Sequence, residues 1–160
     1  METIAVDSGC CNDKPIHVLD LSRYSQLKEI EVGSQCFDGI TEVKLIGMKE
    51  LQRVVIGNLS FCSKYRRITG SFQLKYCERL RELKIGCSSF FSYATCEIAN
   101  LNNLEVIEMG SLGCVGGVFQ DASLVLRSIG CLCHLMNRLA SVEVSSHRQE
   151  RLPILSSCCV

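Results

Sequence analysis

Cysteines and histidines are the residues of this chain with the most potential for chemistry. The densest group is Cys131–His134, which reads C-L-C-H, and the pairs Cys10–Cys11 and Cys158–Cys159 add further thiols. Structural zinc takes four Cys or His ligands, usually from two C-x₂₋₄-C pairs. Here the spaced pair is C-x-C, and adjacent cysteines point apart on an extended chain. We expect core thiols, no bound metal, and no disulfide between Cys131 and Cys133; a metal site is the alternative.

Catalytic motifs are missing from the sequence. A Cys–His nucleophile needs a thiolate beside a base and an oxyanion donor, and none of His17, His134 and His147 has such a context. Nucleotide-binding, serine-hydrolase and zinc-protease motifs are absent. The glycine-rich segment 113–117 is too far from a basic residue to hold phosphate. Prenylation at C-a-a-X needs a cysteine where Ser157 stands. We expect no enzyme, no cofactor and no lipid anchor.

Charge and composition narrow the classes of partner. The 160 residues carry 17 basic and 17 acidic side chains, which disfavours a nucleic-acid or charge-driven membrane partner. No apolar run approaches the roughly 20 residues of a membrane helix. The first 13 residues are polar and acidic and do not form a secretory signal. A cytoplasmic protein is therefore expected, unless the chain is a fragment, with its twelve cysteines mostly as buried thiols.

Alignment of the chain to itself shows what could position these residues. Four anchors, Leu27, Leu51, Leu80 and Leu104, are spaced by 24, 29 and 24 residues. Apolar residues stand at offsets −8, −6, −3, 0, +3 and +5 from each anchor, and glycine stands at +6. The 24 positions are Leu19, Leu21, Tyr24, Leu27, Ile30, Val32; Val43, Leu45, Met48, Leu51, Val54, Ile56; Phe72, Leu74, Cys77, Leu80, Leu83, Ile85; and Cys96, Ile98, Leu101, Leu104, Ile107, Met109. All 24 are apolar in a chain that is 47% apolar, so the repeat is not due to chance.

The spacing predicts the fold class. Offsets +3 and +5, and offsets −8 and −6, each describe a short strand with one buried face. We expect a β-rich repeat solenoid of about four to five turns, with two short parallel strands per turn stacked into two sheets around a thin core. Phe37, Phe61 and Phe90, each ten residues past an anchor, are expected to plug the core at a corner, and extra residues follow Phe61 in a loop.

The ends of the array are less regular. We expect a polar N-terminal segment over residues 1–15, the solenoid over 16–145 and a C-terminal tail over 146–160. The last repeat is interpreted as split by an insertion. Leu124, Leu126 and Ile129 form its first half, and residues 136–144 form its second half. The apolar segment 131–139 is expected to form a short helix in the insertion. Residues 152–155 are expected to fold back as a cap, and a frayed tail is the alternative.

The segments LKEIEVGSQCF, LQRVVIGNLSF and LRELKIGCSSF resemble leucine-rich repeats of the bacterial surface-antigen type, which also occur in large arrays in unicellular eukaryotes. The resemblance covers roughly residues 16–144. It implies a scaffold for protein contacts, sometimes at cell surfaces, and carries no catalytic motif. The chain departs from long members in its shortness and in the lost glycine and aromatic of its last turn. This leaves open whether that turn is a cap or the end of a truncated copy.

Residues between the buried offsets form the predicted contact surface. Offsets +2 and +4 point outward and stack into a strip with steps of about 4.8 Å. The strip comprises Glu29, Glu31, Arg53, Val55, Glu82, Lys84, Val106 and Glu108. We expect it to bind a protein partner, because solenoids present extended surfaces for binding. The alternative is a solvated sheet face in a structural or truncated segment of a larger array, at the cell surface or elsewhere.

Overall fold

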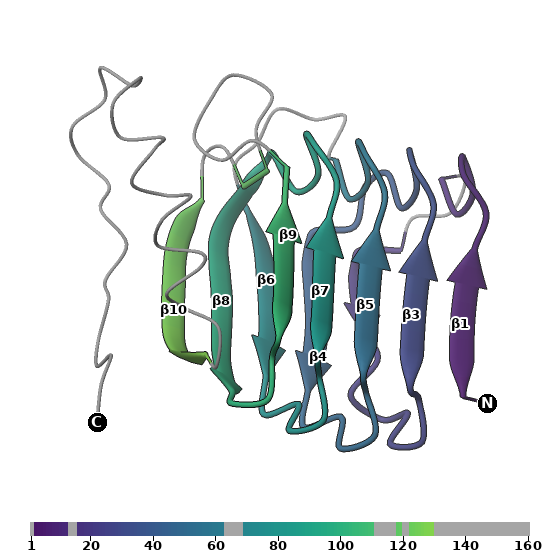
Figure 1. Cartoon of the computed structure of the whole chain (residues 1–160). Helices are drawn as coiled ribbons and strands as arrows, with labels where there is room; N and C mark the ends of the chain where they lie inside the picture. The colour runs from purple at the N-terminus through teal and green to yellow at the C-terminus, as the bar shows by residue number, and fades with distance from the viewer. Residues whose placement is uncertain (1, 13–15, 63–68, 111–117, 120–121, 130–160) are drawn as a thin grey trace.

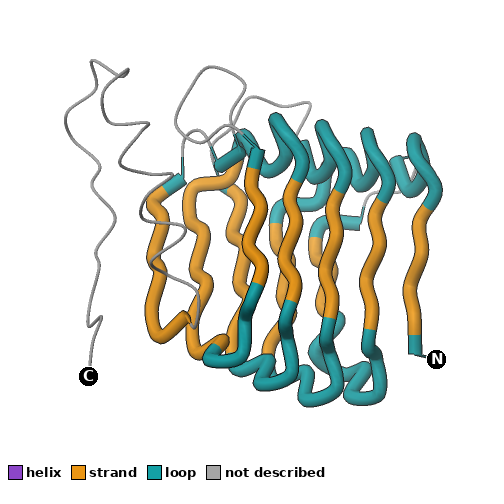
Figure 2. The backbone as a smooth tube through the Cα atoms, viewed as in Figure 1, coloured by secondary structure: helices purple, strands orange, loops and turns teal. Residues whose placement is uncertain are grey.

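The chain coils into a parallel β-solenoid of about four turns (Figure 1). The computed structural model describes residues 2–12, 16–62, 69–110, 118–119 and 122–129. Strands and loops make up these described residues, with no helix among them (Figure 2). Repeat and solenoid, both expected from the spacing of the anchors, are confirmed.

Successive strands alternate between two five-stranded parallel sheets. The odd-numbered sheet contains β1 (Thr3–Val6), β3 (Glu29–Val32), β5 (Arg53–Ile56), β7 (Glu82–Ile85) and β9 (Val106–Met109). The even-numbered sheet contains β2 (Val18–Asp20), β4 (Glu42–Ile46), β6 (Gly70–Lys75), β8 (Tyr93–Leu101) and β10 (Ser123–Ile129). An odd-numbered strand and the even-numbered strand after it make one coil, which is named below by its odd-numbered strand.

The core lies between the two sheets and is built from the repeat positions. Of the 24 predicted core residues, all are buried except Leu19, which is half-buried, and Tyr24. Tyr24 is 48% exposed, so its predicted burial is wrong. It follows β2, the terminal strand of its sheet, so no described coil lies in front of it. The equivalent residues of the next coils, such as Met48, are covered on both sides and fully buried.

The first strand was not predicted. Residues 1–15 were expected to be a polar segment, yet β1 pairs with β3 in the same parallel register that joins β3 to β5. Ile4 lies beside Ile30, and Val6 lies beside Val32. The β1 coil therefore adds one strand to the odd-numbered sheet ahead of the first complete repeat.

At the other end, the predicted first half of the split repeat is confirmed. Leu124 pairs with Cys96, Leu126 with Ile98, and Ile129 with Leu101, so β10 continues the even-numbered sheet. Other expectations lie outside the described residues. These are most of the loop after Phe61, the short helix over 131–139, the second half of the split repeat, the tail over 146–160 and the cap at 152–155.

The corners after β3, β5, β7 and β9 are filled by stacked phenylalanines, as predicted for the first three. Ring centroids lie 4.9 Å apart between Phe37 and Phe61, and 4.8 Å apart between Phe61 and Phe90. Phe119 extends the stack at 4.9 Å from Phe90 and was not predicted, because extra residues shift it away from the ten-residue spacing. The first three and Phe119 all have positive φ, so each of these four corners passes through the left-handed region of backbone conformation.

Candidate functional site: the outer face of the odd-numbered sheet

The eight predicted contact residues lie together on one outer face. They come from four neighbouring strands, β3, β5, β7 and β9, and alternate with buried residues along each strand. One row across the strands contains Glu29, Arg53, Glu82 and Val106, and the next row contains Glu31, Val55, Lys84 and Glu108. We call these eight residues the charged strip.

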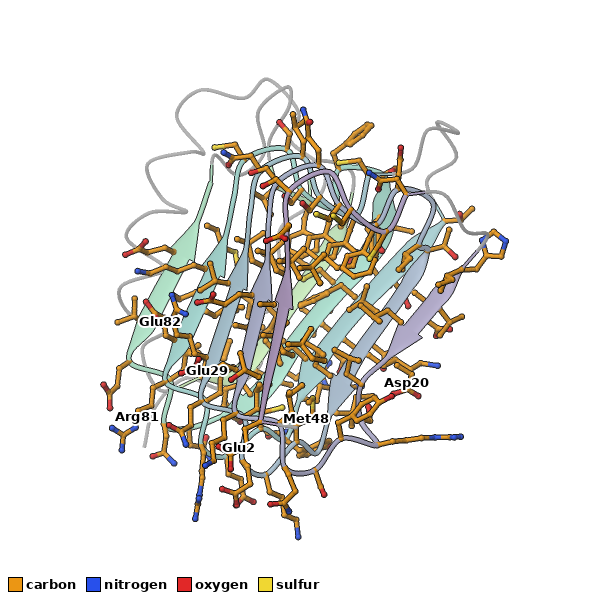
Figure 3. The ribbon with its side chains drawn as sticks, turned by 90° about the vertical axis from the view of Figure 1, so that its right-hand side faces the viewer. Glu2, Asp20, Glu29, Met48, Arg81 and Glu82 are labelled. Atoms are coloured by element: carbon orange, nitrogen blue, oxygen red, sulfur yellow. The ribbon has the colours of Figure 1, made fainter. Side chains whose placement is uncertain are left out.

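Figure 3 views the solenoid from its β1 end. Glu29 and Glu82 project from one side of the molecule, Asp20 projects from the opposite side, and Met48 lies between the two sheets. The charged strip is therefore separated from the even-numbered sheet by the full thickness of the core. A partner lying flat on the strip would not touch the other outer face.

Ion pairs run across the strands of the strip. Arg53 bonds Glu31 on one side, and its Nε lies 2.7 Å from Glu82 Oε2 on the other. Lys84 Nζ lies 2.7 Å from Glu82 Oε1 and 3.7 Å from Glu108 Oε2. The five charged residues thus form one continuous network from β3 to β9. Each cation in it lies between two carboxylates.

The ion pairs favour the charged forms of Glu82, Arg53 and Lys84. The hydrogen bond from Lys84, with a second from Arg53, lowers the pKa of the Glu82 carboxyl. Hydrogen bonds to Glu31 and then Glu82 raise the pKa of the Arg53 guanidinium. The bond to Glu82 likewise raises the pKa of Lys84. Glu82, Arg53 and Lys84 therefore stay ionised at neutral pH.

Three strip residues lie outside this network. Glu29 makes no ion pair within the residues that the structure describes. Val55 is half-buried, and Val106 is 39% exposed. An unpaired carboxylate and two accessible valines are the strip's groups most available to a partner.

A shallow open groove lies at the corner beyond the strip, and sequence reasoning missed it. It has a volume of about 500 Å³ and is lined by Gly57, Gly86 and Gly110 with residues beside them, including Lys84 and Glu108. The column of glycines at offset +6 was the available signal, because three of these glycines line the groove. The amides of these glycines already donate to Val32, Ile56 and Ile85 at 2.7–2.9 Å. They are therefore not available to hold an anion.

The described cysteines divide between the core and the corners that follow the odd-numbered strands. Cys36, Cys77 and Cys96 are buried, as expected, whereas Cys10, Cys11 and Cys87 are exposed, so the expectation of mostly buried thiols holds only in part. Burial raises the pKa of the Cys77 thiol to about 11 and also raises the pKa of the Cys96 thiol. Such thiols are poor nucleophiles at neutral pH.

Metal-binding and catalytic groupings of side chains were the other kinds of site that the sequence suggested. Among the described residues, no three His, Cys, Asp or Glu side chains are arranged to hold a metal ion. His17 is exposed, and its Nδ1 lies 3.4 Å from the Gly39 carbonyl oxygen. The segment Cys131–His134, the pair Cys158–Cys159 and His147 lie outside the described residues, so the predictions about them stay predictions.

Comparison with known proteins gives no relative. No protein-family model, no curated protein and no solved structure matches this chain. Within the described part, no helix is long and apolar enough to cross a lipid bilayer.

Proposed function

We propose that this chain is a protein-interaction module that binds through the charged strip. One observation supports this most directly: four neighbouring strands present their outward side chains in two straight rows on a single face. A rigid sheet face of this kind offers many side chains to an extended partner without any rearrangement of the backbone. On this proposal, Glu29, Val55 and Val106 supply direct contacts, because the network does not occupy them.

The competing proposal is a structural role, as part of a larger repeat array, at the cell surface or elsewhere. The observation that favours it is the network itself, since Arg53 pairs with Glu31 and Glu82 on its two neighbouring strands and Lys84 pairs with Glu108 on β9. Cross-strand pairs of opposite charge stabilise a sheet by about 0.2–1 kcal/mol each. A strip of this composition would keep the sheet face soluble and would stabilise the contact between neighbouring coils, with no need for a partner.

We further propose that the solenoid is of leucine-rich-repeat type. The support is the repeat itself, in which leucine anchors, a short buried strand and a glycine recur in consecutive coils. A cytoplasmic location remains a prediction from the sequence.

Matched charge reversals test the binding proposal. Glu29→Arg in β3 alters the strip, and Glu42→Arg in β4 makes the same change on the opposite sheet. Glu42 loses only an ion pair to Lys44 at 2.8 Å, in which both side chains are about one-third exposed. Val106→Arg supplies a second strip variant. Glu82→Arg is less suitable, because it would place a third cation between Arg53 and Lys84.

The measurement is affinity capture with the full chain as bait, followed by titration of the captured proteins against each purified variant. We expect the strip variants to weaken binding of a captured protein at least tenfold, while Glu42→Arg leaves it unchanged. Equal binding by all variants, or no saturable binding by the native chain, would instead favour the structural role.

A further inference from the structure

Neighbouring coils approach most closely at the glycine of offset +6. A Cβ built on Gly57 would lie 2.7 Å from the carbonyl carbon of Gly33 and the amide nitrogen of Ser34, which belong to the coil before it. The same atom on Gly33 would lie 2.5 Å from the amide nitrogen of Ser8, and on Gly110 it would lie 2.7 Å from Cys87 Cα. Atoms that are not bonded do not come this close. A residue other than glycine here therefore excludes a coil in front of it.

Asp7 occupies this position in the β1 coil. Val6 and Val32 share a register, and each carbonyl accepts the amide of the following coil's glycine at 2.8 Å, from Gly33 and Gly57 respectively. The carbonyl of Asp7 also accepts the Cys36 thiol at 3.1 Å, just as the carbonyl of Gly33 accepts the Ser60 hydroxyl at 2.8 Å. The backbone of Asp7 therefore stands where the other coils have glycine.

We propose that Asp7 is a steric stop that prevents a further coil of this repeat from stacking on the β1 end of the solenoid. The Cβ and carboxylate of Asp7 project into the space that the corner of such a coil would need. Asp7 is exposed, so its charge is solvated in the present arrangement and would be buried by a stacked coil. Both the shape and the charge of the side chain oppose stacking.

The rest of this end would otherwise accept another coil. β1 and β2 are the terminal strands of their sheets, and each has one strand neighbour in the part of the chain that the structure describes. Ile4, Val6 and Leu19 are only partly buried although they face the core. Unpaired strand edges beside apolar side chains promote end-to-end pairing of chains. Asp7 is the residue at this end that does not suit a stacked coil, so replacing Asp7 tests the proposal directly.

The experiment adds one coil to the full chain. A second copy of residues 29–52, which spans one complete coil, is inserted between Glu2 and Thr3 in three versions that carry the native Asp7, Asp7→Ala or Asp7→Gly. Hydrogen exchange of the amides of Thr3–Val6 reports docking, because a stacked coil would pair with β1 and slow exchange. We expect exchange to slow at least about tenfold, and the melting temperature to rise, only in the Asp7→Gly version.

The alanine version separates shape from charge, since it removes the carboxylate and keeps the Cβ. If all three versions dock equally well, Asp7 does not block stacking and the proposal is wrong. If none docks, some other feature closes this end and the proposal is equally wrong. Docking of the alanine version to the same extent as the glycine version would overturn the steric part of the proposal.

Discussion

At the residue scale, each corner is held by side chains that bond the backbone of a neighbouring coil. The amide of Asn58 donates to Ser34 Oγ at 3.1 Å, and the amide of Cys87 donates to Asn58 Oδ1 at 2.8 Å. Two residues after Asn58, the Ser60 hydroxyl also bonds the coil before it. Its Oγ accepts the backbone N–H of Cys36 at 3.2 Å and donates to the carbonyl of Gly33 at 2.8 Å. Parallel sheets do not satisfy the backbone at a corner, so these side chains replace the missing strand partners.

Ser60 tests this role. Ser60→Ala would leave the amide of Cys36 and the carbonyl of Gly33 buried without this partner, and we expect a loss of about 1–3 kcal/mol in the free energy of unfolding. Ser60→Cys is the control, because Cys36 itself makes the equivalent bond through its thiol. Urea denaturation measures both. A cysteine variant as unstable as the alanine variant would show that the bond is not the reason for the loss.

Gly57 tests the close approach of the coils within the native chain. Gly57→Ala places a methyl group 2.7 Å from the backbone of Gly33 and Ser34, so the coils must separate. We expect a loss of about 1–3 kcal/mol or more in the free energy of unfolding. Asp7→Ala at the same position of the first coil should change stability by less than about 0.5 kcal/mol. Equal losses in the two variants would contradict a role for coil-to-coil contact.

At the element scale, strands only three to nine residues long are stabilised by what they bury. β3, β5 and β7 alternate between half-buried and buried residues, which matches the two-residue period of a strand. The two sheets share one continuous core, from Leu21 in the first coil to Ile129 in β10. Strands at the centre of the stack are covered on both sides, whereas β1 and β2 are covered on one side.

Leu83 and Leu19 should show this difference. Leu83→Ala in β7 removes a fully buried side chain, and we expect a loss of about 2–5 kcal/mol in the free energy of unfolding. The same substitution at Leu19 in β2 should cost less, because that side chain is half-buried and opens toward solvent. Chemical denaturation of the two variants makes the comparison. A larger loss at Leu19 would place the most tightly packed part of the core at the β1 end.

At the scale of the whole molecule, coils contact mainly their immediate neighbours, but some side chains reach past the adjacent coil, as Phe72 does to Phe119. The Tyr93 hydroxyl in the β7 coil donates to the carbonyl of Ile40 in the β3 coil at 2.8 Å. It does so across the intervening β5 coil, and its ring packs against Phe90 with centroids 5.0 Å apart. Gly70 leaves room for this ring, because a Cβ there would lie 2.7 Å from it. This bond couples coils that a simple stack would leave independent.

Alkaline pH should destabilise the fold as a whole. Burial raises the pKa of Cys77 to about 11 from 9.0, and also raises the pKa of Cys96 and Tyr93. The unfolded chain loses these protons first, so their contribution to stability is complete below pH 9 and is lost as the pH rises toward 11. We expect the free energy of unfolding to fall by about 1.4 kcal/mol per pH unit for each such group above its unfolded pKa.

Thermal melts between pH 7 and 10.5 measure this slope. Cys77→Ala is the control, because removing one titrating group should reduce the slope by about 1.4 kcal/mol per pH unit whatever its effect on stability at pH 7. A slope that is unchanged in this variant would mean that Cys77 titrates normally in the folded chain.

Much of the solenoid is predictable from the sequence because its signal is local and repeated. A strand with one buried face needs apolar residues two apart, and a stack of identical coils repeats that need at a fixed spacing. The core positions, the first three corner phenylalanines and the continuation of the sheet through Leu124 and Leu126 follow from this periodicity. So does the placement of Glu29 and Glu82 on one outer face.

What required the tertiary structure depends on which coil stands next to which. Ile4 and Val6 belong to a strand, but Asp7 follows them where the repeat has glycine, because no described coil lies in front to demand one. Tyr24 fits the apolar pattern and is nevertheless exposed for the same reason. Pairing of Arg53 with both Glu31 and Glu82, and the bond from Tyr93 to Ile40, join residues more than 20 positions apart. Periodicity specifies the inside of each coil, whereas contacts between coils exist only once the chain has folded.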